Sequence, residues 1–211
     1  MTFKNGAFFF PYAFIIIVLA FVQIRMRQID ISIEINSLHN DVLDQVCKYA
    51  TYLGDGFFSV LGAIIVFRFN PKLAVCLLIS YLLSAGIAQA LKHTLFSEYM
   101  RPIALIGDTQ LKRIHLVDGV DINYKNSFPS GHATSAFAFF TVLAMFAKSN
   151  LNKIIYLLLG CFTAFTRIYL LQHFLIDVFT GAIIGSLIAL LVIHFLITKN
   201  GYELLKSKVK K

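Results

Sequence analysis

The sequence has little charge for its length. Only 14% of its 211 residues are Asp, Glu, Lys or Arg, whereas 58% are apolar and the mean hydropathy is +0.74. These values exclude an ordinary soluble domain, in which about a quarter of the residues carry charge. Three cysteines, an odd number without metal-ligand spacing, give neither a disulfide framework nor a cysteine metal site. Internal repeats and low-complexity linkers are also lacking, so we expect one integral membrane domain over residues 1–211.

Acidic residues are scarce as well, and the formal net charge is +8. Such a charge can indicate nucleic-acid binding. Here, however, five lysines lie in the short tail 199–211, after the last apolar run. A basic, membrane-facing cytoplasmic tail explains them better, so we expect a lipid bilayer as partner and no nucleic acid.

Long apolar runs dominate what remains. Six segments are each about long enough for the ~30 Å hydrocarbon core of a bilayer. They cover residues 7–24, 50–67, 73–91, 132–147, 154–171 and 174–197. The sequence therefore predicts an all-α protein, a six-transmembrane-helix bundle. Residues 25–49 fit an amphipathic connector, and Gly181 and Gly185 form a small-residue pair suited to close helix packing.

The order of these segments predicts an active site at one membrane face. A long loop, about 92–130, joins the third and fourth segments, and a turn over 167–173 joins the fifth and sixth, so both reach the same side. The short basic turns 68–72 and 148–153 and the tail belong to the other side. By the positive-inside rule, both termini are cytoplasmic and the active site is extracytoplasmic, in a membrane that we expect to be the bacterial inner membrane. Arg25 and Arg27 count against this orientation.

Polar residues with phosphate chemistry stand out among the apolar runs. Arg167 can bind phosphate through its planar set of N–H donors, and Ser130 offers a hydroxyl. Gly131 lets a backbone N–H approach an anion closely. Because ionisable groups at membrane depth are costly, they usually serve a function.

Two histidines divide the expected chemistry. His173 and Asp177 are four residues apart, so on a helix they point in directions only roughly 40° apart. The carboxylate can accept the Nδ1–H of the imidazole, which leaves Nε2 free to attack phosphorus. His132 is placed to protonate a leaving group as general acid. This scheme requires no metal and no cofactor.

At these residues the sequence resembles the type 2 phosphatidic acid phosphatases, a superfamily of membrane lipid phosphate phosphatases. The family pattern is a Lys followed by Arg-Pro, then Pro-Ser-Gly-His, then Ser-Arg with a His and an Asp further on. The matching positions are Lys92 and Arg101-Pro102, Pro129 to His132, and Thr166-Arg167 with His173 and Asp177. Two positions depart from the pattern. Eight residues separate Lys92 from Arg101, where the family usually has six, so Lys125 is a second candidate for the lysine; Thr166 replaces a Ser.

The resemblance implies a metal-independent hydrolase of lipid phosphates. His173 would be the nucleophile that forms a phosphohistidine, Asp177 its orienting partner and His132 the acid. The phosphate ligands would be Arg101, Ser130, Gly131, Arg167 and, subject to its spacing, Lys92. The family allows undecaprenyl diphosphate, lipid A phosphate, phosphatidic acid or phosphatidylglycerol phosphate as substrate. Our first expectation is the polyprenyl diphosphate, and the oligomeric state stays open.

Other interpretations of the same residues remain. An intramembrane serine hydrolase would use Ser130 as nucleophile, but it would have no need of the two arginines. A transporter would spread polar residues through the depth of its spans. We expect Asp55 to belong to a turn, and His39, His93, His115 and His194, for which the sequence offers no comparable partner, to be structural or exposed.

Overall fold

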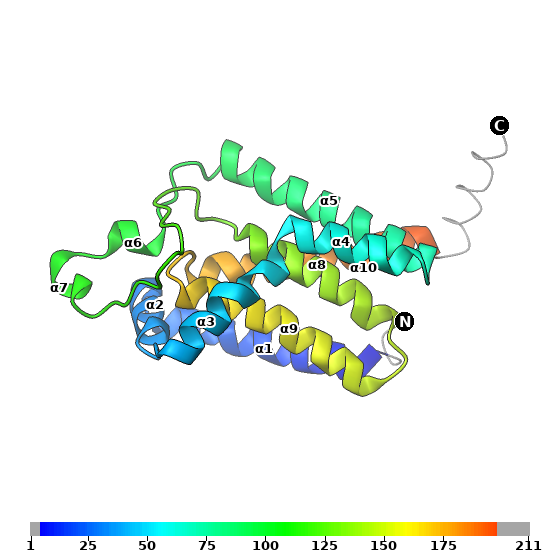
Figure 1. Cartoon of the computed structure of the whole chain (residues 1–211), viewed down its shortest axis with the longest axis horizontal. Coiled ribbons are helices and arrows are strands. Elements are labelled where there is room, and N and C mark those ends of the chain that lie inside the picture. The colour runs from blue at the N-terminus through cyan, green and yellow to red at the C-terminus, as the bar shows by residue number, and fades with distance from the viewer. Residues whose placement is uncertain (1–4, 198–211) are drawn as a thin grey trace.

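The computed structural model describes residues 5–197, and every regular element in that range is helical (Figure 1). In chain order the helices are α1 (Gly6–Arg25), α2 (Gln28–Asn36), α3 (Asp41–Ala50), the 3-10 helix η2 (Thr51–Gly54), α4 (Gly56–Phe67), α5 (Pro71–Thr94), α6 (Pro102–Leu105), α7 (Asp108–Leu111), α8 (Gly131–Phe146), α9 (Asn150–Tyr169) and α10 (Leu175–Ile197). The predicted basic tail, 199–211, lies outside the described residues.

All six predicted apolar segments are helical, but they differ in length. Within residues 5–197, α1, α5, α9 and α10 are each long and apolar enough to cross a membrane. The α3–η2 segment and α4 would add a fifth span if they form one bent unit, with a bend of 62°. α8 has 16 residues and is shorter than the other candidates. The structure thus supports four or five spans, and the sixth stays a prediction.

The second predicted segment, 50–67, is wrong as a single straight helix. η2 ends at Gly54, and α4 starts at Gly56 after a break. At this break the Asp55 Oδ1 atom accepts the N–H of Phe57 at 2.7 Å and caps α4. Side chains that cap a helix start in this way satisfy N–H groups that have no partner within the helix. Asp55 therefore belongs to a turn, as predicted.

α8 forms the centre of the bundle. Its residues 133–142 are all buried, and the helix packs against α5, α9 and α10 (Figure 1). Two glycines let α10 come close. A Cβ atom at Gly181 would lie 2.8 Å from the Ser130 carbonyl oxygen, and one at Gly185 would lie 2.8 Å from the Ala138 nitrogen. The predicted close packing through this small-residue pair is confirmed.

Four helix termini meet at one end of the bundle. α5 and α9 end there and α8 and α10 begin there, close to α2, α3 and the segment that carries α6 and α7 (Figure 1). Between α9 and α10 the chain turns sharply: Leu171 has a φ of 53°, and the Arg167 carbonyl accepts the N–H groups of Gln172 at 2.9 Å and His173 at 3.1 Å. This turn is the bend predicted to bring Arg167 and His173 together.

The expectation about His115 needs a correction. Its Nε2 atom lies 2.7 Å from Asp44 Oδ2, and its ring stacks on His39 at a centroid distance of 4.2 Å. Tyr169 donates its hydroxyl proton to the same carboxylate. His115 therefore does have a carboxylate partner, in a cluster that ties the loop before α8 to α3 and α9. The pairing joins segments 71 residues apart, which the sequence does not reveal.

Candidate active site

The second motif forms the start of α8. The buried Ser130 side chain caps the helix by accepting the N–H of Ala133 at 3.4 Å, and its backbone N–H donates to the Asp177 carbonyl at 3.0 Å. Gly131 is the first helical residue, and a Cβ atom there would have no neighbour within 4 Å. The N-terminus of α8 is thus open to an anion at Gly131, as helix N-termini with free N–H groups often are.

His132 follows in the first turn of α8. η2 packs tightly against its backbone, since a Cβ atom at Gly54 would lie 2.6 Å from the His132 carbonyl oxygen. No side chain other than hydrogen fits there without movement. The close contact at Gly54 therefore holds the backbone of His132 in place against η2.

His173 and Asp177 form the predicted pair, but they do not share a helix as expected: His173 lies in the turn before α10, and Asp177 lies in the first turn of that helix. His173 Nδ1 lies 3.4 Å from Asp177 Oδ2, and both side chains are buried. The same carboxylate oxygen accepts the Phe174 N–H at 2.9 Å and the Ser127 hydroxyl at 2.5 Å. Sequence reasoning missed Ser127, whose only signal is its position two residues before Pro129.

Arg167 is buried near the end of α9. Its Nη1 donates to the Thr51 hydroxyl at 2.6 Å, whereas the buried Nε has no hydrogen-bond partner among the described residues. An unpaired buried guanidinium N–H is costly, and an anion in the cavity would satisfy it. Nothing in the sequence indicates the role of Thr51.

Arg101 enters from the loop before α6. Its Nε donates to the Lys125 carbonyl at 2.9 Å, and its Nη1 donates to the carbonyl and side-chain oxygens of Gln172 at 3.2 and 2.9 Å. These bonds connect it to the turn that carries His173. Burial lowers the pKa of Arg101 from its ordinary value, although an arginine remains charged at neutral pH.

The structure distinguishes the two candidate lysines. Lys92, in the last turn of α5, is buried and lines the same cavity as Arg101. Lys125 is exposed, and its ammonium pairs with Glu98 at 3.0 Å. The longer spacing therefore does not carry Lys92 away from the site, because α5 continues to Thr94 and the chain then folds back.

These residues surround one cavity of about 320 Å³. Of the predicted site residues, six line it: Lys92, Arg101, Gly131, His132, Arg167 and His173. Ser130 and Asp177 are buried and are not among the lining residues. Thr166 is also buried, and its hydroxyl donates to the Thr163 carbonyl at 2.7 Å. Polar side chains that the sequence did not single out also line it: Tyr81, Gln89, Asn123 and Ser135. Three cationic groups, two imidazoles and one carboxylate, that of Asp55, thus line one space.

The electrostatics of the cavity favour a neutral His173. Burial lowers the pKa of His173 well below its ordinary value, and the charges of Arg167, Arg101 and Lys92 lower it further. A neutral imidazole keeps a lone pair for nucleophilic attack. The same cations that repel a proton from His173 attract the anion that it would attack.

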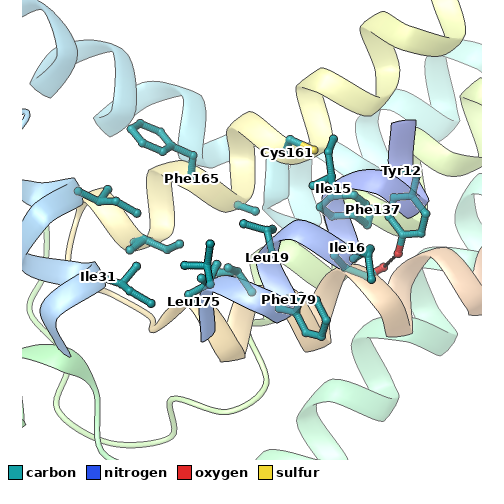
Figure 2. A pocket seen from close by; sticks show the side chains of 16 residues that line it. Tyr12, Ile15, Ile16, Leu19, Ile31, Phe137, Cys161, Phe165, Leu175 and Phe179 are labelled. Atoms are coloured by element: carbon teal, nitrogen blue, oxygen red, sulfur yellow. Dashed lines mark hydrogen bonds between the residues drawn. The ribbon is translucent and has the colours of Figure 1, made fainter. Parts of the chain in front are cut away.

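A second cavity, of about 340 Å³, has the opposite character (Figure 2). It lies between α1, α2, α8, α9 and α10, and its lining includes Ile15, Leu19, Phe137 and Leu175. No charged side chain is among its sixteen lining residues. The Tyr12 hydroxyl donates a hydrogen bond to the Ala182 carbonyl at 3.2 Å. This cavity therefore offers no cation that could bind a phosphate.

Metal ligands are not grouped in the described part of the chain: no three His, Cys, Asp or Glu side chains there are arranged to hold an ion. His132, His173 and Asp177 do not make such a set. The positive field of the site comes from arginine and lysine side chains.

Comparison with known proteins agrees with the motifs. The model of the PAP2 superfamily matches residues 73–200, which include every predicted site residue. The chain belongs to the PAP2 superfamily. This PAP2 protein is similar to the crystal structure of LpxE from Aquifex aeolicus, with a TM-score of 0.68 and 27% identity over 79% of this chain and 94% of that one.

The transmembrane PAP2-type phosphatidylglycerolphosphate phosphatase of Bacillus subtilis shares the fold, with a TM-score of 0.59 and 22% identity over 92% of this chain and 96% of that one. No curated relative matches the PAP2 protein significantly. The resemblance seen in the three motifs is thereby confirmed, and the apolar helices together with these neighbours indicate an integral membrane protein.

Proposed function

We propose that this PAP2 protein is a metal-independent lipid phosphatase that hydrolyses a phosphomonoester or diphosphate lipid through a phosphohistidine at His173. One observation carries the proposal: a buried histidine, backed by the Asp177 carboxylate, lines a cavity together with the cations of Lys92, Arg101 and Arg167. Cations fixed around a transferring phosphoryl group stabilise the charge of its transition state.

In the first half-reaction, Nε2 of His173 attacks phosphorus. The N–P bond forms as the bond from phosphorus to the leaving oxygen breaks, and the electron pair goes to that oxygen, which takes a proton from His132. Asp177 accepts the Nδ1–H of His173 and balances the positive charge that develops on the imidazole. The group that leaves is the lipid alcohol or lipid monophosphate.

In the second half-reaction, water attacks the phosphohistidine. His132 takes the proton of the water, the N–P bond breaks, and the electron pair returns to Nε2 of His173. Phosphate then leaves. Because Lys92, Arg101 and Arg167 surround the cavity, a proton on His132 becomes favourable only when a bound phosphate dianion offsets their charge. We therefore expect His132 to gain its proton when the substrate binds.

The two alternative functions have less support. A serine hydrolase would need the Ser130 hydroxyl in the cavity, whereas this buried side chain caps α8 and does not line the cavity. A transporter would place charges along a path through the spans. Here the charged groups gather where α5 and α9 end and α8 and α10 begin.

We also propose that the site faces outward from a bacterial inner membrane, with both termini cytoplasmic. The basic turns before α5 and α9 lie at the opposite end of the bundle from the catalytic cavity, as the positive-inside rule favours. Single cysteines at Lys112 and Asn152, in a background without the native cysteines, test this. A membrane-impermeant maleimide should label the first in intact cells and the second only after permeabilisation; the reverse pattern would invert the topology.

A lipid panel tests the reaction itself. The purified protein in detergent should release phosphate from at least one of four substrates: undecaprenyl diphosphate, phosphatidic acid, lipid A phosphate or phosphatidylglycerol phosphate. Release should persist in EDTA and stop with vanadate, whose trigonal-bipyramidal form imitates the transferring phosphoryl group. Activity that EDTA abolishes and Mg²⁺ or Zn²⁺ restores would refute metal independence. Release from none of the four would refute the lipid phosphatase.

A further inference from the structure

Ser127 lies outside the three motifs yet contacts the catalytic pair. It belongs to the segment between α7 and α8, and its side chain is buried, with 1% of its surface exposed. Its hydroxyl donates to Asp177 Oδ2 at 2.5 Å and lies 3.5 Å from His173 Nδ1. It is not among the residues that line the catalytic cavity.

The contacts of Asp177 Oδ2 show what the hydroxyl does. Three donors surround this oxygen: Ser127 Oγ at 2.5 Å, the Phe174 N–H at 2.9 Å and His173 Nδ1 at 3.4 Å. The two shorter bonds fix the carboxylate, and the imidazole is the most loosely held of the three. Hydrogen bonds of this kind to a carboxylate favour its charged form.

The same segment also positions Arg101, one of the predicted phosphate ligands. The Tyr124 carbonyl accepts the Arg101 backbone N–H at 2.8 Å, and the Lys125 carbonyl accepts the Arg101 Nε–H at 2.9 Å. The Ser127 N–H in turn donates to the Tyr99 carbonyl at 3.0 Å. A segment that orients Arg101 through its backbone therefore orients Asp177 through one side chain.

We propose that Ser127 is a positioning residue of the phosphatase reaction, the third member of a Ser–Asp–His hydrogen-bond chain. Its hydroxyl keeps the Asp177 carboxylate charged and directed at His173 Nδ1, so that the imidazole can carry positive charge while Nε2 holds the phosphoryl group. Ser127 keeps its proton in both half-reactions and forms no covalent bond. The proposal rests on the proposed function for its kinetic consequences.

Kinetics of three variants test the role of the hydroxyl. Ser127→Ala should lower kcat by roughly 10- to 100-fold, the effect of losing a hydrogen bond to a charged group. KM and the vanadate inhibition constant should stay within about threefold, because no phosphate contact is lost. Ser127→Thr, which keeps the hydroxyl, should recover most of kcat. Ser186→Ala is the matched control, since it removes another buried hydroxyl that bonds to Thr141 at 3.2 Å, and its kcat should be unchanged.

A reactivity measurement separates this proposal from the phosphatase assignment. Diethyl pyrocarbonate modifies neutral imidazoles, and mass spectrometry gives the rate at His173 whether or not any substrate is known. The rate should fall in Ser127→Ala and in Asp177→Asn, fall no further in the double variant, and stay unchanged in Ser186→Ala. If the wild type releases no phosphate but this pattern holds, the reaction is wrong and the hydrogen-bond chain stands.

Several outcomes would overturn the proposal. One is a normal kcat and a normal His173 modification rate in Ser127→Ala. A second is an equal rise in KM and in the vanadate constant, which would make Ser127 a support for phosphate binding instead. A third is a Ser127→Thr variant no better than Ser127→Ala, and a fourth is an equal loss in Ser186→Ala. If Ser127→Ala does not fold, the rates of His173 modification in Ser127→Thr and Asp177→Asn test the proposal instead. A slow rate in Ser127→Thr would refute the hydrogen-bond chain, and so would a normal rate in Asp177→Asn.

Discussion

Two cavities of similar size, about 320 Å³ and about 340 Å³, share the helices α8 and α9 but have opposite chemistry. Residues close together on one helix line different cavities. On α9, Arg167 lines the catalytic cavity and Ile168 lines the apolar one. On α8, Ser135 lines the catalytic cavity and Phe137 lines the apolar one. The catalytic cavity lies where helices start and stop, whereas the apolar cavity lies mainly along helix interiors. Helix ends leave N–H groups without partners and admit turns, so they can bind an anion, while a helix interior offers only side chains.

The largest expected effect is at the nucleophile. His173→Ala should lower phosphatase activity by roughly 10⁴-fold or more, because a covalent mechanism loses its reacting atom. It should also abolish the acid-labile phosphate label trapped by quenching during turnover with ³²P-labelled substrate. Persistence of that label in His173→Ala, or Ser130→Ala as the single inactive variant, would transfer the covalent step to a serine.

His132 should come next, and its effect should depend on the substrate. His132→Ala should slow hydrolysis of a lipid phosphate by ~10²- to 10⁴-fold, the usual contribution of a general acid. An aryl phosphate, whose leaving group needs no proton, should partly rescue this variant and should not rescue His173→Ala. Because His132 also activates water in the second half-reaction, the comparison uses the rate of phosphoenzyme formation. Equal losses of that rate on both substrates would show that His132 does not protonate the leaving group.

The cations should have a similar or slightly smaller effect. Lys92→Ala and Arg101→Ala should each lower kcat/KM by roughly 10²- to 10³-fold, because each removes a fixed positive charge from the transition state. Lys125→Ala, the matched control, should leave kcat/KM nearly unchanged, since that ammonium pairs with Glu98 at the surface. Normal kinetics in Lys92→Ala with a defect in Lys125→Ala would reverse the assignment of the lysine.

The low pKa of His173 predicts a smaller effect, on the pH profile. A histidine with an ordinary pKa of about 6.5 would lose about threefold of its neutral form between pH 7 and pH 6. The pKa of His173 lies well below that value, so its imidazole stays neutral across this range. After correction for ionisation of the substrate, kcat/KM should fall by less than about 1.5-fold between these pH values. A threefold fall would show an ordinary histidine.

The sequence predicted the parts of the molecule that depend on local pattern. The apolar runs predicted the helices, because a segment that crosses a bilayer must form its backbone hydrogen bonds within itself. The order of the motifs and the alternating direction of the spans correctly predicted that one end of the bundle holds Lys92, Arg101, His132, Arg167 and His173. The spacing anomaly at Lys92 did not matter, because α5 extends to Thr94 before the chain returns.

What the sequence could not predict depends on pairs far apart in the chain. Thr51 meets Arg167 across 116 residues, Gln172 meets Arg101 across 71 and Ser127 meets Asp177 across 50. Hydroxyl and amide groups occur at many positions, and their partners are set by tertiary packing alone. The turn at Asp55, whose side chain caps the start of α4, was predicted, but the 62° bend between the helices on either side of it was not, because tertiary packing sets that angle.

The smallest expected effect compares the two cavities directly. Ala182 lines only the apolar cavity, whereas Ser135 lines the catalytic one. Ala182→Val adds two methyl groups next to empty apolar space, so its stability should change by less than about 1.5 kcal/mol. Its kcat/KM should stay within about twofold, as expected for a site without shared contacts. Ser135→Val replaces a hydroxyl with a methyl group and adds one further methyl beside the catalytic cavity. It should lower kcat/KM by roughly tenfold, because small displacements there disturb alignment for attack. Thermal unfolding in detergent and steady-state kinetics measure both variants. If Ala182→Val lost activity tenfold at normal stability, the apolar cavity would take part in substrate binding, and the separation between a catalytic and a chemically inert cavity would fail.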